Sequence, residues 1–127
     1  MLRKENRFHG SRGVRLAYRG KQVRGRFLSF RYSKRDEPGY RIAIVVSRKV
    51  SKSAVIRNRI RRRLYELVRT QYQGALGGYD CIVTVYDVTL ATLTPRKLTN
   101  ELHGVLSKAL PGRFTREERG IVEGQKE

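Results

Sequence analysis

Apolar residues recur along this chain at two different spacings, which predict where helices and strands lie. Between residues 47 and 69, the apolar side chains fall within an arc of roughly 120° when the segment is plotted at ~100° per residue. A stripe of this width is typical of a helix that packs one side against a core. The stripe consists of Ile56, Ile60, Leu64, Leu67 and Val68, and it leaves Tyr65 on the outer surface.

A second helix is predicted after residue 94. Thr94 can cap it, Pro95 suits its first turn, and Pro111-Gly112 ends it. Its apolar side consists of Leu98, Leu102, Val105 and Leu106. A shorter helix is expected at 11–19, with Gly20 as its stop.

Three segments rich in β-branched and aromatic residues predict strands, at 23–33, 40–47 and 79–87. A polar turn containing Pro38-Gly39 separates the first two, which we therefore expect to pair as an antiparallel hairpin. Alternation places Phe30 and Tyr32 on one side of the first strand and Arg31 on the other.

The order of these elements predicts an α+β sandwich, with helices on one face of a small sheet. A length of 127 residues suits one compact domain, which we place at residues 1–112. Within it, residues 1–12 form a basic N-terminal arm. Residues 113–127 mix both charges and are expected to fray as a flexible tail.

The balance of charge narrows the choice of partner. Lys and Arg number 29 against 11 Asp and Glu, a net charge of +18, which favours an anionic partner. The sequence contains neither an apolar run of roughly 18 residues nor a secretory h-region. Nucleic acid is therefore favoured over a membrane, and we expect a cytoplasmic location.

The basic residues concentrate in the first predicted helix and the segment before it. Residues 47–69 contain nine Lys and Arg and one acid, Glu66. A solvated basic face is the ordinary explanation of such a run, but a structural helix normally intersperses charges of both signs. The imbalance favours a polyanion as the neutralising partner.

The side chains that could perform protein catalysis or hold a metal are scattered. Asp36, Glu37, Asp80 and Asp87 fall at turns or strand ends, and no nucleophilic triad is suggested. Cys81 stands alone in an apolar run, and with one Cys and two distant His no zinc-ligand spacing exists. We expect neither a catalytic residue nor a metal ligand in the protein.

One sequence run resembles a known family. Ala54 to Arg62, AVIRNRIRR, preceded by Val46-Ser47-Arg48-Lys49, is similar to the signature of the protein subunit of bacterial ribonuclease P. The resemblance extends over roughly residues 2–110 and includes Val23-Arg24-Gly25 and Tyr79-Asp80. It implies an α-β-β-β-α-β-α order with a left-handed βαβ crossover, similar to a domain of ribosomal protein S5.

The resemblance also implies a function. Such a subunit binds the catalytic RNA and the 5′ leader of precursor tRNA in a ribonucleoprotein, where the RNA and its bound Mg²⁺ perform the hydrolysis. We expect a monomeric protein in a 1:1 complex. The residues implied in RNA-subunit binding are Arg48, Lys49, Arg57, Asn58, Arg59, Arg61 and Arg62, and those implied in a leader-binding cleft are Tyr18, Phe30 and Tyr32.

Two alternatives remain open from the sequence. A ribosomal protein would be equally basic, and a protein-only nuclease would belong to another functional class. A DNA-binding helix-turn-helix does not fit, because no second helix precedes the basic helix by a short turn.

Overall fold

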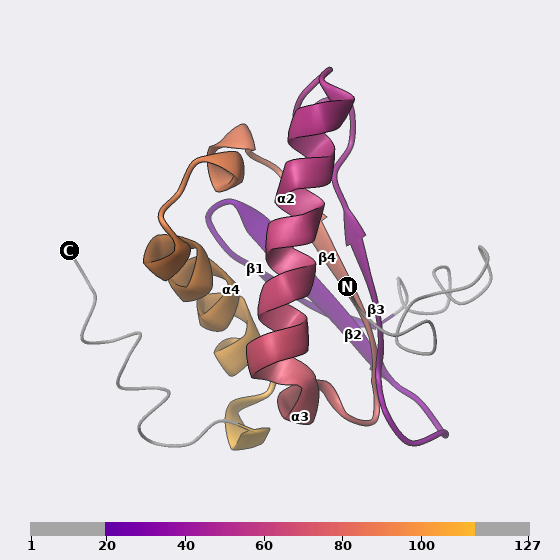
Figure 1. Ribbon diagram of the computed structural model, residues 1–127. Helices are drawn as coiled ribbons and strands as arrows, with labels where there is room; N and C mark the ends of the chain where they lie inside the picture. Colours follow the sequence, from indigo (N-terminus) through magenta and orange to yellow (C-terminus); the bar gives the residue numbers. More distant parts are fainter. Residues whose placement is uncertain (1–19, 114–127) are drawn as a thin grey trace.

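The computed structural model describes residues 20–113, which form a four-stranded sheet with helices on one face (Figure 1). The main elements are β1 (Lys21–Arg24), β2 (Leu28–Lys34), β3 (Arg41–Val45), α2 (Ala54–Leu67), β4 (Tyr79–Val85) and α4 (Pro95–Ala109). Shorter helical segments are η2 (Val68–Tyr72), α3 (Gln73–Leu76), η3 (Val88–Ala91) and η4 (Pro111–Arg113). This α+β architecture is the one that the sequence predicts.

The strand order β1-β2-β4-β3 corrects the expected hairpin. β2 pairs antiparallel with β1 and β4, whereas β3 pairs parallel with β4 and not with β2. The physical reason is the burial of β4, whose residues Asp80 to Val83 are all buried. A strand this apolar gains most from the centre of the sheet, with a partner on each side.

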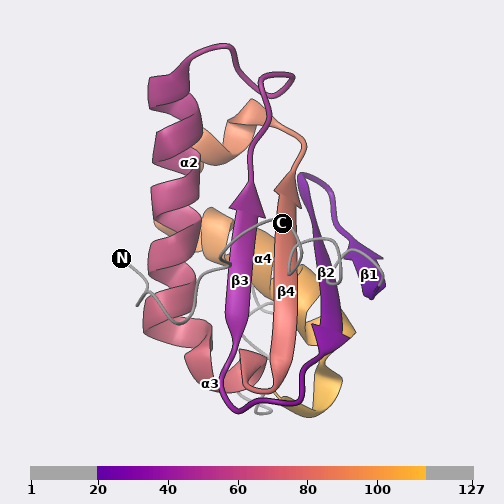
Figure 2. The same ribbon diagram turned by 90° about the vertical axis from the view of Figure 1, so that its right-hand side faces the viewer.

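The crossover from β3 through α2 to β4 is left-handed, as the family resemblance implies. In Figure 2, β3 and β4 both point upward, with β4 to the right of β3. α2 lies on the side of the sheet that faces away from the viewer, as comparison with Figure 1 shows. A right-handed connection, the usual form, would place β4 on the other side of β3.

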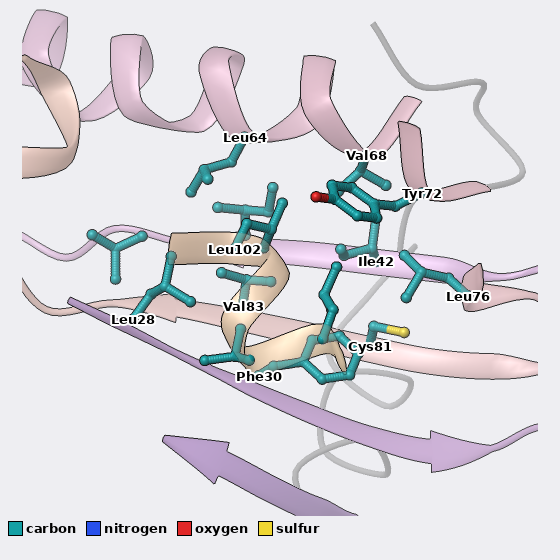
Figure 3. Close-up of a cluster of buried hydrophobic side chains, with 14 of the residues drawn as sticks. Leu28, Phe30, Ile42, Leu64, Val68, Tyr72, Leu76, Cys81, Val83 and Leu102 are labelled. Carbon is teal, nitrogen blue, oxygen red and sulfur yellow. The ribbon is translucent and has the colours of Figure 1, made fainter. Parts of the chain in front are cut away.

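The core fills the space between the sheet and its helices (Figure 3). α2 contributes the fully buried Ile60 and Leu64, and α4 contributes Leu102. The sheet contributes a row across three strands, in which Phe30 of β2 pairs with Val83 of β4, and Val83 with Ile44 of β3. The apolar stripes of both predicted helices therefore face this core.

Several predictions fall on residues that the structure does not describe. The short helix at 11–19, the N-terminal arm and the tail from residue 114 lie outside the described residues. The domain boundaries at 1–112 and 113–127 remain predictions. The predicted start of the helix after residue 94 is confirmed in α4, since Thr94 is its N-cap and accepts a hydrogen bond from the Lys97 amide, and Pro95 occupies the first turn.

Candidate nucleic-acid interface

The basic segment divides into a loop and a helix. Residues 46–53 connect β3 to α2, and α2 begins at Ala54 with Ser53 as its N-cap. The Ser53 hydroxyl accepts from the Ile56 amide at 3.3 Å, which satisfies one of the free N–H groups of the first turn. The loop therefore leads directly into the first basic turn of the helix.

Arg57 fastens this loop to the helix. Its guanidinium donates to the carbonyl oxygens of Ser51 at 2.9 Å and Lys52 at 3.0 Å. Part of its hydrogen-bonding capacity is thus used within the protein. Arg57, which the family resemblance implies as an RNA contact, also holds the loop in its conformation.

Arg61 and Asn58 are joined on the next turn. Arg61 donates to the Asn58 side-chain oxygen and, at 3.5 Å, to the Val46 carbonyl at the end of the β3 segment. Asn58 is exposed, and its amide group still has N–H donors for an external acceptor. The pair therefore holds one donor group in a fixed place on the outer surface.

The remaining cations of this surface point into solvent. Arg48, Lys49 and Lys52 on the loop and Arg59 and Arg62 on α2 are all exposed. In the part of the chain that the structure describes, none of these five forms an ion pair with a carboxylate. We call these five residues the α2 cation face. Its charges are exposed and have no ion-pair partner among the described carboxylates, an arrangement that a polyanion stabilises.

Two polar residues of α2, Arg63 and Tyr65, make hydrogen bonds within the protein. Arg63 donates to the Leu90 carbonyl at 2.7 Å and to that of Leu93, which ties α2 to η3 and the following loop. Burial lowers the pKa of Arg63, and the neighbouring charge of Arg59 lowers it further. Tyr65, predicted on the outer surface, is half-buried and accepts from the Ile44 amide at 3.1 Å, so that prediction is wrong.

The expected wall of the leader cleft also needs correction. Phe30 is completely buried on the sheet face that the helices cover, so no base can stack on it. Tyr32 lies on the same face, half-buried, with its hydroxyl donating to the Ala109 carbonyl of α4 at 3.0 Å. Tyr18 lies outside the described residues. Phe30 and Tyr32 therefore lie on the sheet face that packs against the helices.

The opposite sheet face, which no described helix covers, carries polar and cationic residues on β1 and β2, whereas Ile82 of β4 on the same face is completely buried. Across it Gln22, Arg31, Ile82 and Ala43 form one row, since each is the register partner of the next. Arg31 donates to the Gln22 side-chain oxygen at 2.9 Å. We call this side the open sheet face; it is visible in Figure 2.

An aromatic ring stands at the end of the open sheet face. Tyr86 is 40% exposed and donates to the Ser29 hydroxyl at 2.8 Å. The guanidinium carbon of Arg24 lies 4.7 Å from the centroid of its ring, within cation–π distance. Neither Tyr86 nor Arg24 stands out in the sequence as part of a ring and cation pair. Their pairing depends on how β1, β2 and β4 align.

Acidic side chains of the described residues are largely engaged with neighbours. Asp80 pairs with Arg41 and Arg35, Glu66 with Arg69, and Asp87 accepts from the backbone and hydroxyl of Thr89. These Thr89 bonds lower the pKa of Asp87. Residues 20–113 contain no group of three or more His, Cys, Asp or Glu side chains placed to hold a metal ion.

No helix among the described residues is long and apolar enough to cross a membrane.

Comparisons with known proteins agree with this geometry. The family model for ribonuclease P matches residues 2–110. The ribonuclease P protein component of a Pseudanabaena species is 35% identical over 111 residues, covering 86% of this chain and 95% of its own length. That of Syntrophomonas wolfei is 32% identical over 117 residues, covering 91% and 95%.

Solved structures agree as well. The ribonuclease P protein of Staphylococcus aureus superposes with a TM-score of 0.72 at 25% identity, covering 82% of this chain and 94% of that one. The protein from Thermotoga maritima, at 22% identity and a TM-score of 0.68, covers 76% and 91% and shares the fold. The basic loop and helix, the left-handed crossover and these relatives together place the chain in the family of bacterial ribonuclease P protein components.

Proposed function

We propose that this chain acts in ribonuclease P by docking the α2 cation face on the catalytic RNA, and so assists removal of the 5′ leader from precursor tRNA. The observation that carries the proposal is that face itself: exposed cations on one loop and one helix, with no ion pair to a described carboxylate. RNA phosphates would neutralise them and release counterions. Asn58 would add a directed hydrogen bond.

The leader would follow a separate path, over the open sheet face. A single strand is typically held by a cationic channel and by stacking on rings, at about 1 to 3 kcal/mol per base. Arg31 and the stacked Arg24 and Tyr86 supply both chemistries on that face. Tyr18, from the segment before β1, would add a second ring.

The chemistry of cleavage would reside in the RNA subunit. Mg²⁺ held chiefly by that RNA would supply the phosphodiester hydrolysis. This part of the proposal is supported by the engagement of Asp80, Glu66 and Asp87 with neighbouring protein groups. The protein would thus position two RNA molecules relative to each other. The proposal includes a monomeric protein, a 1:1 complex and a cytoplasmic location.

Cleavage of precursor tRNA tests the proposal. The recombinant chain should increase the rate at which a bacterial ribonuclease P RNA cleaves precursor tRNA at low Mg²⁺ concentration, where the charge of the RNA alone is poorly neutralised. Without that RNA, the chain should not cleave precursor tRNA. Cleavage by the protein alone would instead support the protein-only nuclease. An absence of stimulation, with tight binding to ribosomal RNA, would support the ribosomal alternative.

A further inference from the structure

A small pocket lies where the β1–β2 turn meets α4. It has a volume of about 180 Å³, below the roughly 300 Å³ at which pockets for drug-sized ligands begin. It therefore suits a small polar group. Its lining includes Arg24 at the end of β1, Arg26 of the turn, and Glu101 and Lys108 of α4.

Two glycines give the pocket its shape. A Cβ on Gly25 would lie 2.7 Å from the Val105 side chain, so the absence of a side chain lets the turn pack directly on α4. A Cβ on Gly104 would meet nothing within 4 Å. Glycine inside a helix is less favourable than alanine, and packing does not require it at this position. The consequence of Gly104 is an open space beside Glu101 and Lys108.

The charge around this space is positive but not uniform. Arg24, Arg26 and Lys108 against Glu101 give three cations and one carboxylate, a net charge of +2. Within the described residues none of the three cations forms an ion pair. Arg26 lies over the Phe27 ring, with its guanidinium carbon 4.9 Å from the centroid. A stacked arginine is already ordered, so it loses little freedom when it binds a phosphate.

Glu101 distinguishes the pocket from a plain anion site. An ionised carboxylate only accepts hydrogen bonds, and it would repel a phosphate that offered nothing in return. Desolvation raises the pKa of Glu101, so its partial burial is unfavourable for the isolated protein. A ligand that carries a phosphate and also a hydroxyl donor satisfies both kinds of group. Ribose provides that donor in its 2′-hydroxyl, which DNA lacks.

We propose that this pocket binds the sugar-phosphate part of one nucleotide of single-stranded RNA, with the phosphate against Arg26 and Lys108, the 2′-hydroxyl donating to Glu101 and the base outside the pocket. The site is separate from the α2 cation face. β1 and β3 are the two edges of the sheet, and α2 lies beside β3 whereas the pocket adjoins β1 (Figure 2). An RNA strand held here therefore adds an anchor that does not depend on docking of α2.

Nuclear magnetic resonance of the full chain tests the site directly. Titration with uridine 3′-monophosphate should shift the amide signals of Gly25 and Gly104, and deoxyuridine 3′-monophosphate should bind roughly tenfold more weakly, since it lacks one hydrogen bond to a charged acceptor. If neither amide shifts with the ribonucleotide, the proposal is wrong. Equal affinity for the two nucleotides would remove the assigned role of Glu101.

Variants distinguish binding in the pocket from non-specific attraction of the nucleotide to the positively charged chain. Gly104→Gln fills the space without a clash at its Cβ and should abolish the binding, whereas Gly104→Ala should largely retain it. Lys108→Gln should weaken binding roughly tenfold, while Lys97→Gln, with the same charge change on α4 outside the pocket, should leave it unchanged. Unaltered binding by Gly104→Gln, with the folded spectrum preserved, would place the nucleotide elsewhere.

Discussion

Arg41 and Asp80 join the two parallel strands of the sheet through a two-pronged ion pair. The Arg41 guanidinium donates from Nε and Nη2 to the two carboxylate oxygens, each at 2.9 Å. The two residues are register partners of β3 and β4. Arg35 approaches the same carboxylate at 3.7 Å. The chain connects β3 to β4 through the long crossover and not through a tight turn that would set their register. The ion pair therefore helps to fix which residues of the two strands lie opposite each other.

Replacing Asp80 should therefore destabilise the fold. Asp80 is buried, and Asp80→Ala would leave Arg35 and Arg41 without their shared acceptor, at a cost of about 3 kcal/mol. Urea denaturation followed by circular dichroism measures the change. Glu37→Gln is the matched control, because it removes the 80%-exposed ion-pair partner of Arg35 and should cost less than about 1 kcal/mol. Similar losses for both variants would contradict this assignment.

Removing charges from the α2 cation face should weaken RNA binding and reduce its dependence on salt, and should leave the protein folded. Arg59→Ala with Arg62→Ala should weaken binding to ribonuclease P RNA, and the slope of log affinity against log salt should fall by about 2, roughly one unit per lost phosphate contact. Both side chains are exposed, so circular dichroism should be unchanged. Binding measured at several salt concentrations gives the slope, and an unchanged slope would exclude these two residues from the interface.

Arg63→Ala removes a cation from the same helix, but one that we assign to folding and not to RNA binding. It removes the bonds to the Leu90 and Leu93 carbonyls, so the free energy of unfolding should fall by about 1 to 3 kcal/mol. At a temperature where the variant remains folded, its salt slope should match that of the unaltered chain. A reduced slope with normal stability would move Arg63 to the RNA side.

The sequence predicts features that depend on residues close together in the chain better than features that depend on distant residues. The apolar stripe of α2, its basic surface and the Thr94-Pro95 start of α4 depend on residues within a few positions of each other, and the sequence predicts them. The pairing of β3 with β4 depends on residues 39 positions apart, and the Pro-Gly turn favoured a hairpin instead. The hydrophobic pattern did not decide which strand takes the centre of the sheet, because β3 (RIAIV) and β4 (YDCIVTV) are both largely apolar.

The same limit explains the error at Phe30. Alternation correctly places Phe30 and Tyr32 on one face of β2 and Arg31 on the other, as the register shows. It does not say which face meets the helices. The larger apolar side chains pack against α2 and α4, because that burial stabilises the fold most. The other side of β2, which carries the half-buried Arg31, is therefore the side that we propose for the leader.

Replacing Glu101 by glutamine should stabilise the folded protein, by an amount that depends on pH. Desolvation raises its folded pKa above the ordinary value of 4.5, so the folded state disfavours the ionised form. The resulting loss of stability is absent below the unfolded pKa and develops as pH rises through the folded pKa. Glu101→Gln should therefore stabilise the chain at neutral pH, by about a few tenths of a kcal/mol given its partial exposure.

Urea midpoints at neutral pH and near pH 4 test this sign. The stabilisation by Glu101→Gln should be seen at neutral pH and should diminish near pH 4. A variant that is less stable at neutral pH would show instead that the Glu101 carboxylate has a favourable partner in the folded protein.

Cys81 should be inert in the folded protein. It is completely buried in β4, and burial raises the pKa of its thiol, which disfavours the reactive thiolate. Labelling by a thiol reagent should therefore be at least about a thousandfold slower than in urea, because the reagent must wait for the strand to open. The absorbance of the released thiol product measures both rates. Rapid labelling of the folded chain would mean that β4 opens locally.

Substitutions at Tyr18 and Phe30 should separate leader binding from packing. We expect Tyr18→Ala to weaken binding of precursor tRNA with a long 5′ leader by roughly fivefold or more, and to leave mature tRNA unaffected, because one stacked base contributes about 1 to 3 kcal/mol. Phe30 is completely buried, so Phe30→Ala should cost about 3 to 5 kcal/mol of folding free energy. Any loss of RNA binding by that variant should follow the unfolded fraction and affect both RNAs equally.

Filter binding of both RNAs, together with thermal unfolding of each variant, distinguishes the two mechanisms. An equal loss by Tyr18→Ala for precursor and mature tRNA would remove Tyr18 from the leader path. A leader-specific defect in a fully folded Phe30→Ala protein would mean that the leader reaches the helix-covered side of the sheet. Because Phe30 lies beneath α4 and between its neighbours on β1 and β4, that result would require α4 to move away when RNA binds.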